Sequence, residues 1–450
     1  MKVLVRLCFV CSLGLSVWAQ DSTSGSSSNV AAPYEGLSGK APVRIGMVGA
    51  ESVPISISMT LDGSYDTLLG AFRVDQDGKL TPGAGSYGVD GGFTISGQKK
   101  LRRSVFGISY LANYNRFFNV NNFNGTNQSL NLGYSRRMTK RTELTWNTAG
   151  SISNRVLGNL LNRQTDGLQF FSAPTSELFD AKIYFFQSSM SVGYRLTSRW
   201  ELQFSGNGGV MRRQARALAD TNLFGGTAGA NYRLSRRSSL GLTYTYSHFD
   251  FGKQFGESDI NGASVNFSRD LRKGWQASAH VSVFDVRTVG VRRVELDPVI
   301  AALLGANQGS EAFRSVTKTP GFGASVSKRI RLTSYSVSVD RGVQPGNGLI
   351  LTSVVSTYTA SANYQLKGKW SMSASALRTK MDSIGTGSQL GAFSMDSVQV
   401  RFMRKLTREI GFTGGVEYRK FKIDGSALDR NGSRVSVGLS YAPNSLPFGK

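Results

Sequence analysis

Hydrophobic and polar positions alternate with a period of two along much of the chain, most clearly over Ala228–Tyr246. Either side of the polar connection Ser235–Ser238, alanine, leucine and tyrosine alternate with glycine, threonine and other small or polar residues. A period of two indicates strands, and two such runs around a tight connection indicate a β-hairpin. A soluble sandwich would bury the apolar face, whereas a lipid-exposed barrel would turn it outward, so this hairpin alone leaves both folds open.

The same unit recurs from Ile55 to Tyr441 and predicts about 18 strands, with roughly 16 as the alternative. Every second connection is short, as in Lys99–Ser104, and the others are mostly long, as in Ser151–Ile183 and Val286–Pro320. An even number of strands with short turns at one end and long loops at the other is typical of outer-membrane barrels. We therefore predict an all-β chain forming a single transmembrane antiparallel up-and-down β-barrel, with short periplasmic turns and long extracellular loops.

The N-terminus has the pattern of a secretory signal peptide over residues 1–19. Lys2 and Arg6 precede the apolar run Leu7–Val17, and Ala19 is the small residue expected before cleavage. The apolar run is too short for a transmembrane helix, which needs about 20 residues. The only cysteines, Cys8 and Cys11, leave with the signal, and neither lies in a convincing lipobox.

The rest of the chain divides into three parts. Residues 20–50 are rich in serine, glycine and alanine at first and predict a flexible periplasmic lead. The barrel is expected over residues 51–441, followed by a C-terminal tail at 442–450.

The formal net charge of +24 could indicate nucleic-acid binding, but an exported protein seldom meets nucleic acid. The basic residues gather at the short turns, where acidic residues are rare: Lys99, Lys100, Arg102, Arg103, Arg136, Arg137, Lys140, Arg141, Arg236, Arg237, Arg329, Arg331, Arg404, Lys405 and Arg408. The acidic residues lie mostly in the long loops. We interpret the basic rim as facing anionic headgroups of the inner leaflet; the alternative is that these turns are merely soluble.

Aromatic residues keep a fixed distance from the short turns. Trp200, Trp275 and Trp370 each open a strand directly after one, and several tyrosines lie within a few residues of one: Tyr134, Tyr194, Tyr232, Tyr335 and Tyr364. Rings at one level of every hairpin predict a girdle at the membrane interface, whereas core aromatics would show no such fixed distance.

The faces opposite the apolar ones are dominated by serine, threonine, asparagine and glutamine, with few bulky residues. A barrel of 16 to 18 strands leaves an aqueous channel, which such a lining suits. The charged exceptions are mainly basic, and we predict these lumen-lining residues: Arg233, Arg401, Arg434, Gln276, His280 and Gln399.

Two long loops could narrow the channel. Asp297–Gly305 has the N-cap, early proline and terminal glycine of a short helix. Val156–Leu161 carries apolar residues at helical spacing. Whether these segments pack over the barrel mouth or fold inward is left open by the sequence.

Little in the sequence indicates catalysis. His248 and His280 are the only histidines. His248 lies in the run Ser247–Asp250, but neighbours on a strand point to opposite faces, so these residues would not converge as a catalytic triad. No metal-binding, phosphate-binding or dinucleotide-binding motif is present, so neither an enzyme nor a cofactor is expected.

From Ile55 to Tyr441 the chain resembles a bacterial outer-membrane β-barrel of the porin kind. The final run ending at Tyr441 is similar to the terminal assembly signal of such proteins, except that Ala442–Lys450 follows it. The hairpin Leu234–Leu240 also resembles large barrels linked to exopolysaccharide export.

The resemblance implies a Gram-negative outer-membrane location, insertion by the barrel-assembly machinery, and contact with the lipid bilayer. Two functions remain open. One is a passive channel for small polar solutes, for which the mainly basic lining exceptions and the basic rim predict a weak preference for anions. The other is an export or surface-anchoring barrel whose loops bind a partner. The oligomeric state is left open.

Overall fold

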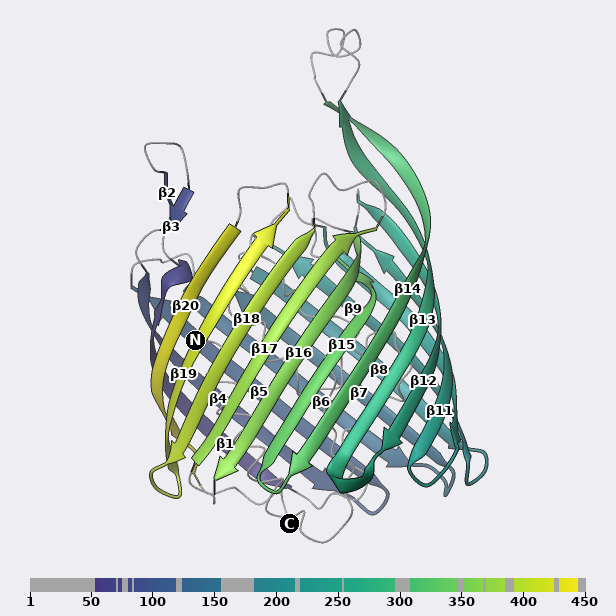
Figure 1. Cartoon of the computed structure of the whole chain (residues 1–450), viewed down its shortest axis with the longest axis horizontal. Coiled ribbons are helices and arrows are strands. Elements are labelled where there is room, and N and C mark those ends of the chain that lie inside the picture. Colours follow the sequence, from purple (N-terminus) through teal and green to yellow (C-terminus); the bar gives the residue numbers. More distant parts are fainter. Residues whose placement is uncertain are drawn as a thin grey trace.

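A computed structural model describes residues 53–69, 72–74, 80–82, 85–118, 124–154, 182–214, 219–252, 255–295, 308–346, 351–366, 370–384, 392–424 and 429–443. Eighteen strands form one antiparallel sheet, which closes because the first strand pairs with the last. A separate pair of short strands, β2 and β3, makes a small hairpin above one rim (Figure 1). The predicted all-β barrel of about 18 strands is confirmed.

The barrel strands run in chain order around the sheet, with bounds β1 Val53–Asp66, β4 Ser86–Lys100, β5 Ser104–Phe117, β6 Gly125–Arg137, β7 Thr142–Asn154, β8 Lys182–Arg195, β9 Trp200–Arg213, β10 Thr221–Arg233, β11 Ser238–Asp250, β12 Gly256–Asp270, β13 Trp275–Glu295, β14 Gln308–Ile330, β15 Thr333–Pro345, β16 Thr352–Leu366, β17 Trp370–Ser383, β18 Phe393–Lys405, β19 Ile410–Ile423 and β20 Asp429–Tyr441. The short strands are β2 Phe72–Val74 and β3 Leu80–Pro82, and the 3-10 helices are η1 Thr67–Leu69 and η3 Arg272–Gly274.

One end of the barrel, here the short-turn end, carries the tight connections and also the start of β1 and the end of β20 (Figure 1). Three of its turns share one device: the hydroxyls of Thr139, Thr197 and Thr407 each accept hydrogen bonds from the backbone N–H groups two and three residues later, at 2.9–3.2 Å. Because the hydroxyl replaces backbone partners, a threonine can close the chain locally without glycine. The other end is the long-connection end.

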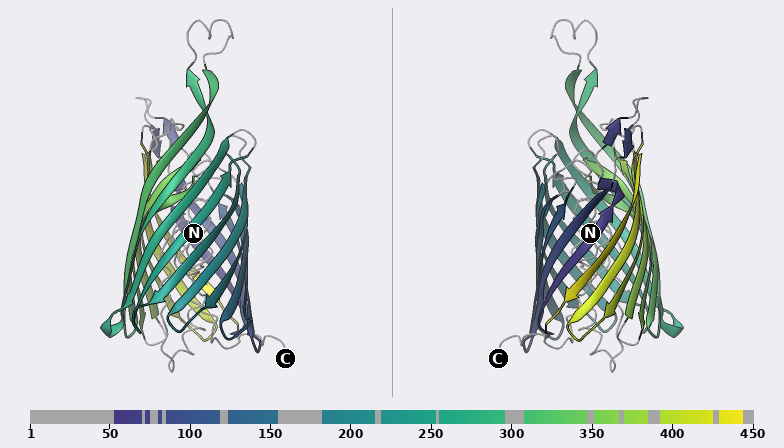
Figure 2. Two further views of the ribbon diagram at one scale, coloured as in Figure 1. Left: turned by 90° about the vertical axis from the view of Figure 1, so that its right-hand side faces the viewer. Right: turned by 90° about the vertical axis from the view of Figure 1, so that its left-hand side faces the viewer.

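The predicted loop Val286–Pro320 is wrong in its bounds. β13 and β14 have 21 and 23 residues and remain paired as far as Glu295 and Gln308. Together they form an arm that rises above the neighbouring strands (Figure 2). The alternation of Val289 and Val291 with Thr288 and Gly290 is itself a strand pattern. The helical segments predicted at Asp297–Gly305 and Val156–Leu161 lie outside the described residues, as do residues 1–52 and 444–450.

The two faces of the sheet differ as the alternation predicts. Apolar and aromatic side chains stand exposed on the outer face, for example Leu61, Phe204, Leu242, Val337 and Leu439. Polar residues of the inner face are mostly buried. No helix among the described residues is long and apolar enough to cross a membrane.

The inner face is less uniformly polar than the sequence suggested. Ile183, Met211, Leu223 and Phe249 stand at inner positions near the long-connection end and belong to a buried apolar cluster. A second cluster, which includes Met381, Phe393, Met395 and Phe421, lies at the same end of β17–β19. Part of the interior is therefore lined by apolar side chains. They pack against one another, because exposing them to water would be costly.

Candidate functional site: the inner wall of the barrel

Charged side chains gather on the inner wall where the two ends of the sheet meet. We call these residues the seam cluster; they come from β1, β4 and β18–β20 and are all buried: Asp62, Asp66, Asp90, Arg401, Glu417, Arg419 and Arg434. Burying an ionised group is costly unless other groups compensate its charge and hydrogen-bonding capacity. The arrangement of partners therefore decides what this cluster can do.

Three contacts of the seam cluster each pass over an intervening strand. Nη2 of Arg419 on β19 lies 2.5 Å from Oδ2 of Asp66 on β1, and β20 runs between them. Nη2 of Arg434 on β20 lies 3.5 Å from Oδ2 of Asp90 on β4, with β1 between. The Thr413 hydroxyl donates a 3.1 Å hydrogen bond to Asp62, again across β20. Side-chain contacts thus join both sides of the closure.

A glycine makes room for one of these crossings. Asp62 pairs in register with Gly438, which pairs with Thr413, and a Cβ at Gly438 would overlap the Asp62 carboxylate. The same device recurs on β13–β15, where His280, Gly323 and Asp340 stand in register. His280 Nε2 lies 3.5 Å from Asp340 Oδ2, and a Cβ at Gly323 would overlap the His280 ring.

The predicted lumen residues occupy different environments. His280, Gln399, Arg401 and Arg434 are buried at inner positions, and the two arginines belong to the seam cluster. Gln276 is half-buried near the short-turn end, as is expected from its place at the start of β13. Arg233, the last residue of β10, is exposed at the short-turn end rather than within the barrel.

Sequence reasoning missed the acidic half of the inner wall. The prediction that charged exceptions are mainly basic is wrong, because Asp62, Asp66, Asp90, Asp340 and Glu417 all stand at inner positions. The alternation held the signal: Thr60, Asp62 and Ser64 alternate with outward Met59, Leu61 and Gly63. What it lacked was the partner of each carboxylate, several of which lie hundreds of residues away.

The aromatic residues predicted at the interface lie on the outer face near the short turns, with Trp200, Trp275 and Trp370 exposed by 38–42%. Tyr194 and Tyr364 are exposed and Tyr134 and Tyr232 are half-buried. Basic residues of the rim contact these rings: Lys328 Nζ lies 4.4 Å from the Trp275 ring centroid, and the Arg404 guanidinium 5.0 Å from that of Trp370. Such cation–π contacts attract the basic side chain to the face of the ring. They suit a ring that lies between an apolar and a charged environment.

At the short-turn end, a pocket of about 420 Å³ lies between the β8–β9 and β10–β11 turns and the end of β12. Its lining includes residues of the inner face, among them Asn231, Gly241 and Asn266, and five arginines: Arg195, Arg199, Arg233, Arg236 and Arg237. Two carboxylates, Glu201 and Asp270, also line it. The basic rim predicted from the sequence therefore includes a concave site.

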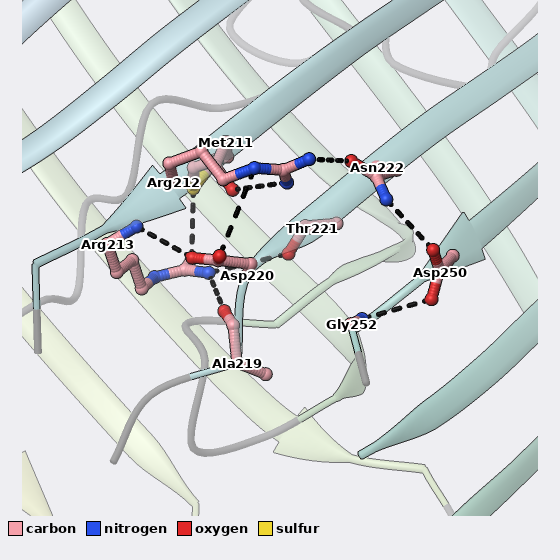
Figure 3. A network of polar contacts seen from close by, with 9 residues as sticks. All are labelled: Met211, Arg212, Arg213, Ala219, Asp220, Thr221, Asn222, Asp250 and Gly252. Carbon is pink, nitrogen blue, oxygen red and sulfur yellow. Dashed lines mark hydrogen bonds and ion pairs between the residues drawn. The ribbon is translucent and has the colours of Figure 1, made fainter. Parts of the chain in front are cut away.

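At the long-connection end, a polar network holds the end of β9, the start of β10 and the end of β11 together (Figure 3). The backbone N–H of Arg213 donates to Asp220 at 2.8 Å, while its guanidinium donates to the Ala219 carbonyl. Arg212 Nη2 donates to Asn222 at 2.6 Å, and Asn222 donates to Asp250 at 2.8 Å. These bonds join two hairpins and satisfy backbone groups where the regular sheet ends.

The structure offers no arrangement typical of catalysis around His248. Its Nδ1 lies 2.9 Å from Asp259 Oδ1 on the outer face, whereas neighbouring Ser247 points to the inner face. Within the described ranges, no group of three or more His, Cys, Asp or Glu side chains is placed to hold a metal ion.

A closed antiparallel barrel with an apolar exterior and polar interior defines the class of protein. All its strands find hydrogen-bond partners within the sheet, which is the condition for crossing a bilayer with strands, and short turns oppose long connections. The chain is therefore a transmembrane β-barrel of the outer-membrane type, with porin-like architecture.

Comparison with known proteins adds likeness of fold only. No protein-family model and no curated protein matches the chain. Three solved structures are similar: Pseudomonas aeruginosa OpdK with vanillate (12% identity, TM-score 0.41, 86% of this chain and 98% of that one), a BenF-like porin from Pseudomonas fluorescens Pf-5 (9%, 0.45, 88% and 99%), and Pseudomonas aeruginosa OccK2 in complex with glucuronate (11%, 0.44, 88% and 100%). Identities and TM-scores of this size transfer no function to this chain.

Proposed function

We propose that this protein is an outer-membrane channel for passive diffusion of small polar solutes. The observation that carries the proposal is the closed barrel of 18 strands whose inner positions are largely hydroxyls, amides and paired charges. Barrels of 16 to 18 strands are wide enough to enclose an aqueous channel. Serine and threonine rows such as Ser336–Ser361 and Ser338–Thr359, each at 2.6 Å, suit contact with water.

Single-channel recording of the refolded protein in planar bilayers tests this directly. Folded protein should give discrete conductance steps, and Ser361→Trp on the inner face of β16 should lower their size because the indole occupies lumen volume. Ala360→Trp is the matched control, since the neighbouring position faces lipid. Folded protein without conductance steps would contradict the channel.

We further propose a weak anion preference whose source is the short-turn mouth. The seam cluster holds three arginines and four carboxylates, so this cluster contributes little net charge to the interior. Three exposed residues lie on the inner face where their strands end: Arg137, Arg195 and Arg233. They place positive charge at the short-turn mouth of the barrel. Charges at a pore entrance bias the permeating ion, but only within about 8 Å at physiological salt.

Reversal potentials in a salt gradient measure this bias. We expect the reversal potential to shift slightly toward the equilibrium potential of the anion, and this shift should fade as the salt concentration rises. A clear cation preference would contradict it. The same rim, with its cation–π contacts to Trp275 and Trp370, supports contact with anionic headgroups of the inner leaflet.

A second candidate function is export or surface anchoring, in which the protein binds a partner. The β13–β14 arm favours it. β15 pairs with β14 only from Phe322 onward, so the described stretch Gln308–Gly321 presents a long strand edge to a partner. Lys318 and Pro320 on that edge discourage non-specific addition of a further strand. Replacing residues 291–316 by a tight turn separates the two functions: a channel keeps its conductance, whereas an anchoring barrel loses its partner.

A further inference from the structure

The pocket at the short-turn end differs from every other charged site described above. In the seam cluster the carboxylates outnumber the arginines, and two of its arginines contact carboxylates directly. In the pocket, five arginines face two carboxylates, which leaves three positive charges within about 420 Å³. Such an excess in a concave site attracts anions far more than the same charges spread over a flat rim, since the low-dielectric walls focus the field.

The shape of the pocket comes from the register of three strands. Asn231, Gly241 and Asn266 stand side by side on β10, β11 and β12, and the Asn231 amide lies over Gly241. Because Gly241 has no side chain, the Asn231 amide can occupy the space above it. Ser239 and Ser268, joined at 2.6 Å, add hydroxyls on the next row toward the rim. Neutral hydrogen-bonding groups therefore form the wall below the arginines.

The arginines come from two independent turns, so they approach an anion from different sides. Arg195 ends β8 and Arg199 lies in the turn after it, whereas Arg233 ends β10 and is followed by a turn with Arg236 and Arg237. The turns are held locally: Thr197 accepts the Arg199 N–H at 3.2 Å, and Ser235 accepts the Arg237 N–H at 3.1 Å. Guanidinium groups bind phosphate oxygens in pairs, with planar geometry that an ammonium group cannot supply.

We propose that this pocket is a binding site for an anion bearing one or more phosphate groups. Its volume lies in the range of small-ligand sites, and inner-face residues open it toward the mouth of the lumen, while Trp200 and Phe267 line its membrane-facing side. The phosphate can belong to a small soluble ester or to a phospholipid headgroup. The site does not depend on the barrel conducting ions, so it stands apart from the channel function.

Isothermal titration calorimetry of the full chain in zwitterionic detergent, with pyrophosphate as the probe, tests the site. We expect one saturable site per chain, and an affinity loss of about tenfold or more in the variant Arg195→Gln/Arg233→Gln/Arg237→Gln, because charge-assisted bonds to phosphate are lost. The control Arg102→Gln/Arg103→Gln/Lys140→Gln removes the same charge from other turns of the same end and should change affinity less than about twofold. The single variant Arg237→Gln, at an exposed turn position, serves if the triple variant does not fold.

Equal losses in the two triple variants, or binding that never saturates, would overturn the proposal and leave only diffuse attraction to the basic rim. The source of the phosphate is distinguished by repeating the titration in nanodiscs. If phosphatidylglycerol abolishes pyrophosphate binding that phosphatidylcholine permits, the headgroup occupies the site. If both lipids permit it, the ligand is a soluble anion. Either result supports a phosphate site, and neither depends on conductance.

Discussion

Two walls of the barrel differ in what they turn inward: the wall that carries the seam cluster and the far wall, β10–β15. Both follow the same alternation of inner and outer residues. The seam wall buries ion pairs that cross strands, such as Arg419–Asp66. The far wall presents small residues, including inward glycines at Gly225, Gly229 and Gly262, and it holds the ion pair His280–Asp340 at inner positions. Composition alone would not separate them, since both read as polar faces.

The difference reflects what each wall has to join. Strands β10–β15 follow one another through turns, so each hairpin brings its own partner close. The seam joins β1 to β20, segments with no turn between them, and Arg419 and Asp66 lie 353 residues apart. Loop closure over such distances is entropically costly, and side chains that span the closure add specific contacts where no turn holds the strands together. Both walls use a glycine to let side chains of the two flanking strands meet over the strand between them: Gly438 at the seam and Gly323 on the far wall.

The largest expected effect is on the seam. Arg419→Gln removes a guanidinium that is 1% exposed and leaves Asp66, equally buried, without its 2.5 Å partner. Breaking one side of a buried pair costs about 3–5 kcal/mol, because the remaining charge is uncompensated. The measurement is the free energy of unfolding in urea, for protein folded reversibly into lipid vesicles.

The control for that experiment is Arg378→Gln on the outer face. Arg378 lies 3.6 Å from Asp396, but its side chain is 64% exposed, and exposed pairs contribute less than about 1 kcal/mol. Equal losses for the two variants would show that the seam pairs contribute no more than surface pairs.

Intermediate effects are expected from the glycines that allow crossings. Gly438→Ala should displace Asp62 from Thr413, and Gly323→Ala should displace His280 from Asp340. Overpacking of this kind costs about 1–3 kcal/mol. Gly91→Ala, where a Cβ meets nothing within 4 Å, is the matched control in the same urea titration. If Gly323→Ala proves neutral while Gly438→Ala does not, crossing contacts matter only at the seam.

The smallest effect is expected at the rim, outside both walls. Lys328→Gln removes the cation 4.4 Å from the Trp275 ring and should lower the free energy of unfolding by about 0.5–1 kcal/mol.

Brominated lipids should quench the fluorescence of Trp200, Trp275 and Trp370 most strongly when the bromine lies near the headgroups. Strongest quenching at the bilayer centre would contradict the register of these strands, because the rings would then lie at mid-depth.

The strands, their faces and the turns can be predicted from the sequence, because each depends on neighbours within a hairpin. The alternation around Ala228–Tyr246 and the position of Trp200 after Thr197 are local signals, and β9, β10 and β11 follow them. The same local signal is present at Val286–Val291, where the long gap between short turns predicts a loop but β13 continues as a strand.

How the two ends of the sheet meet, and which charges are paired there, becomes visible only in the folded barrel. Asp62, Asp66 and Arg434 each stand at a predictable inner position, but the register of β1 against β20 sets which residue lies opposite. A shift of two residues would keep every face and change every pair. The pocket of five arginines likewise depends on two turns lying side by side around the closed sheet. Period and turn chemistry act over a few residues, whereas closure is a property of the whole chain.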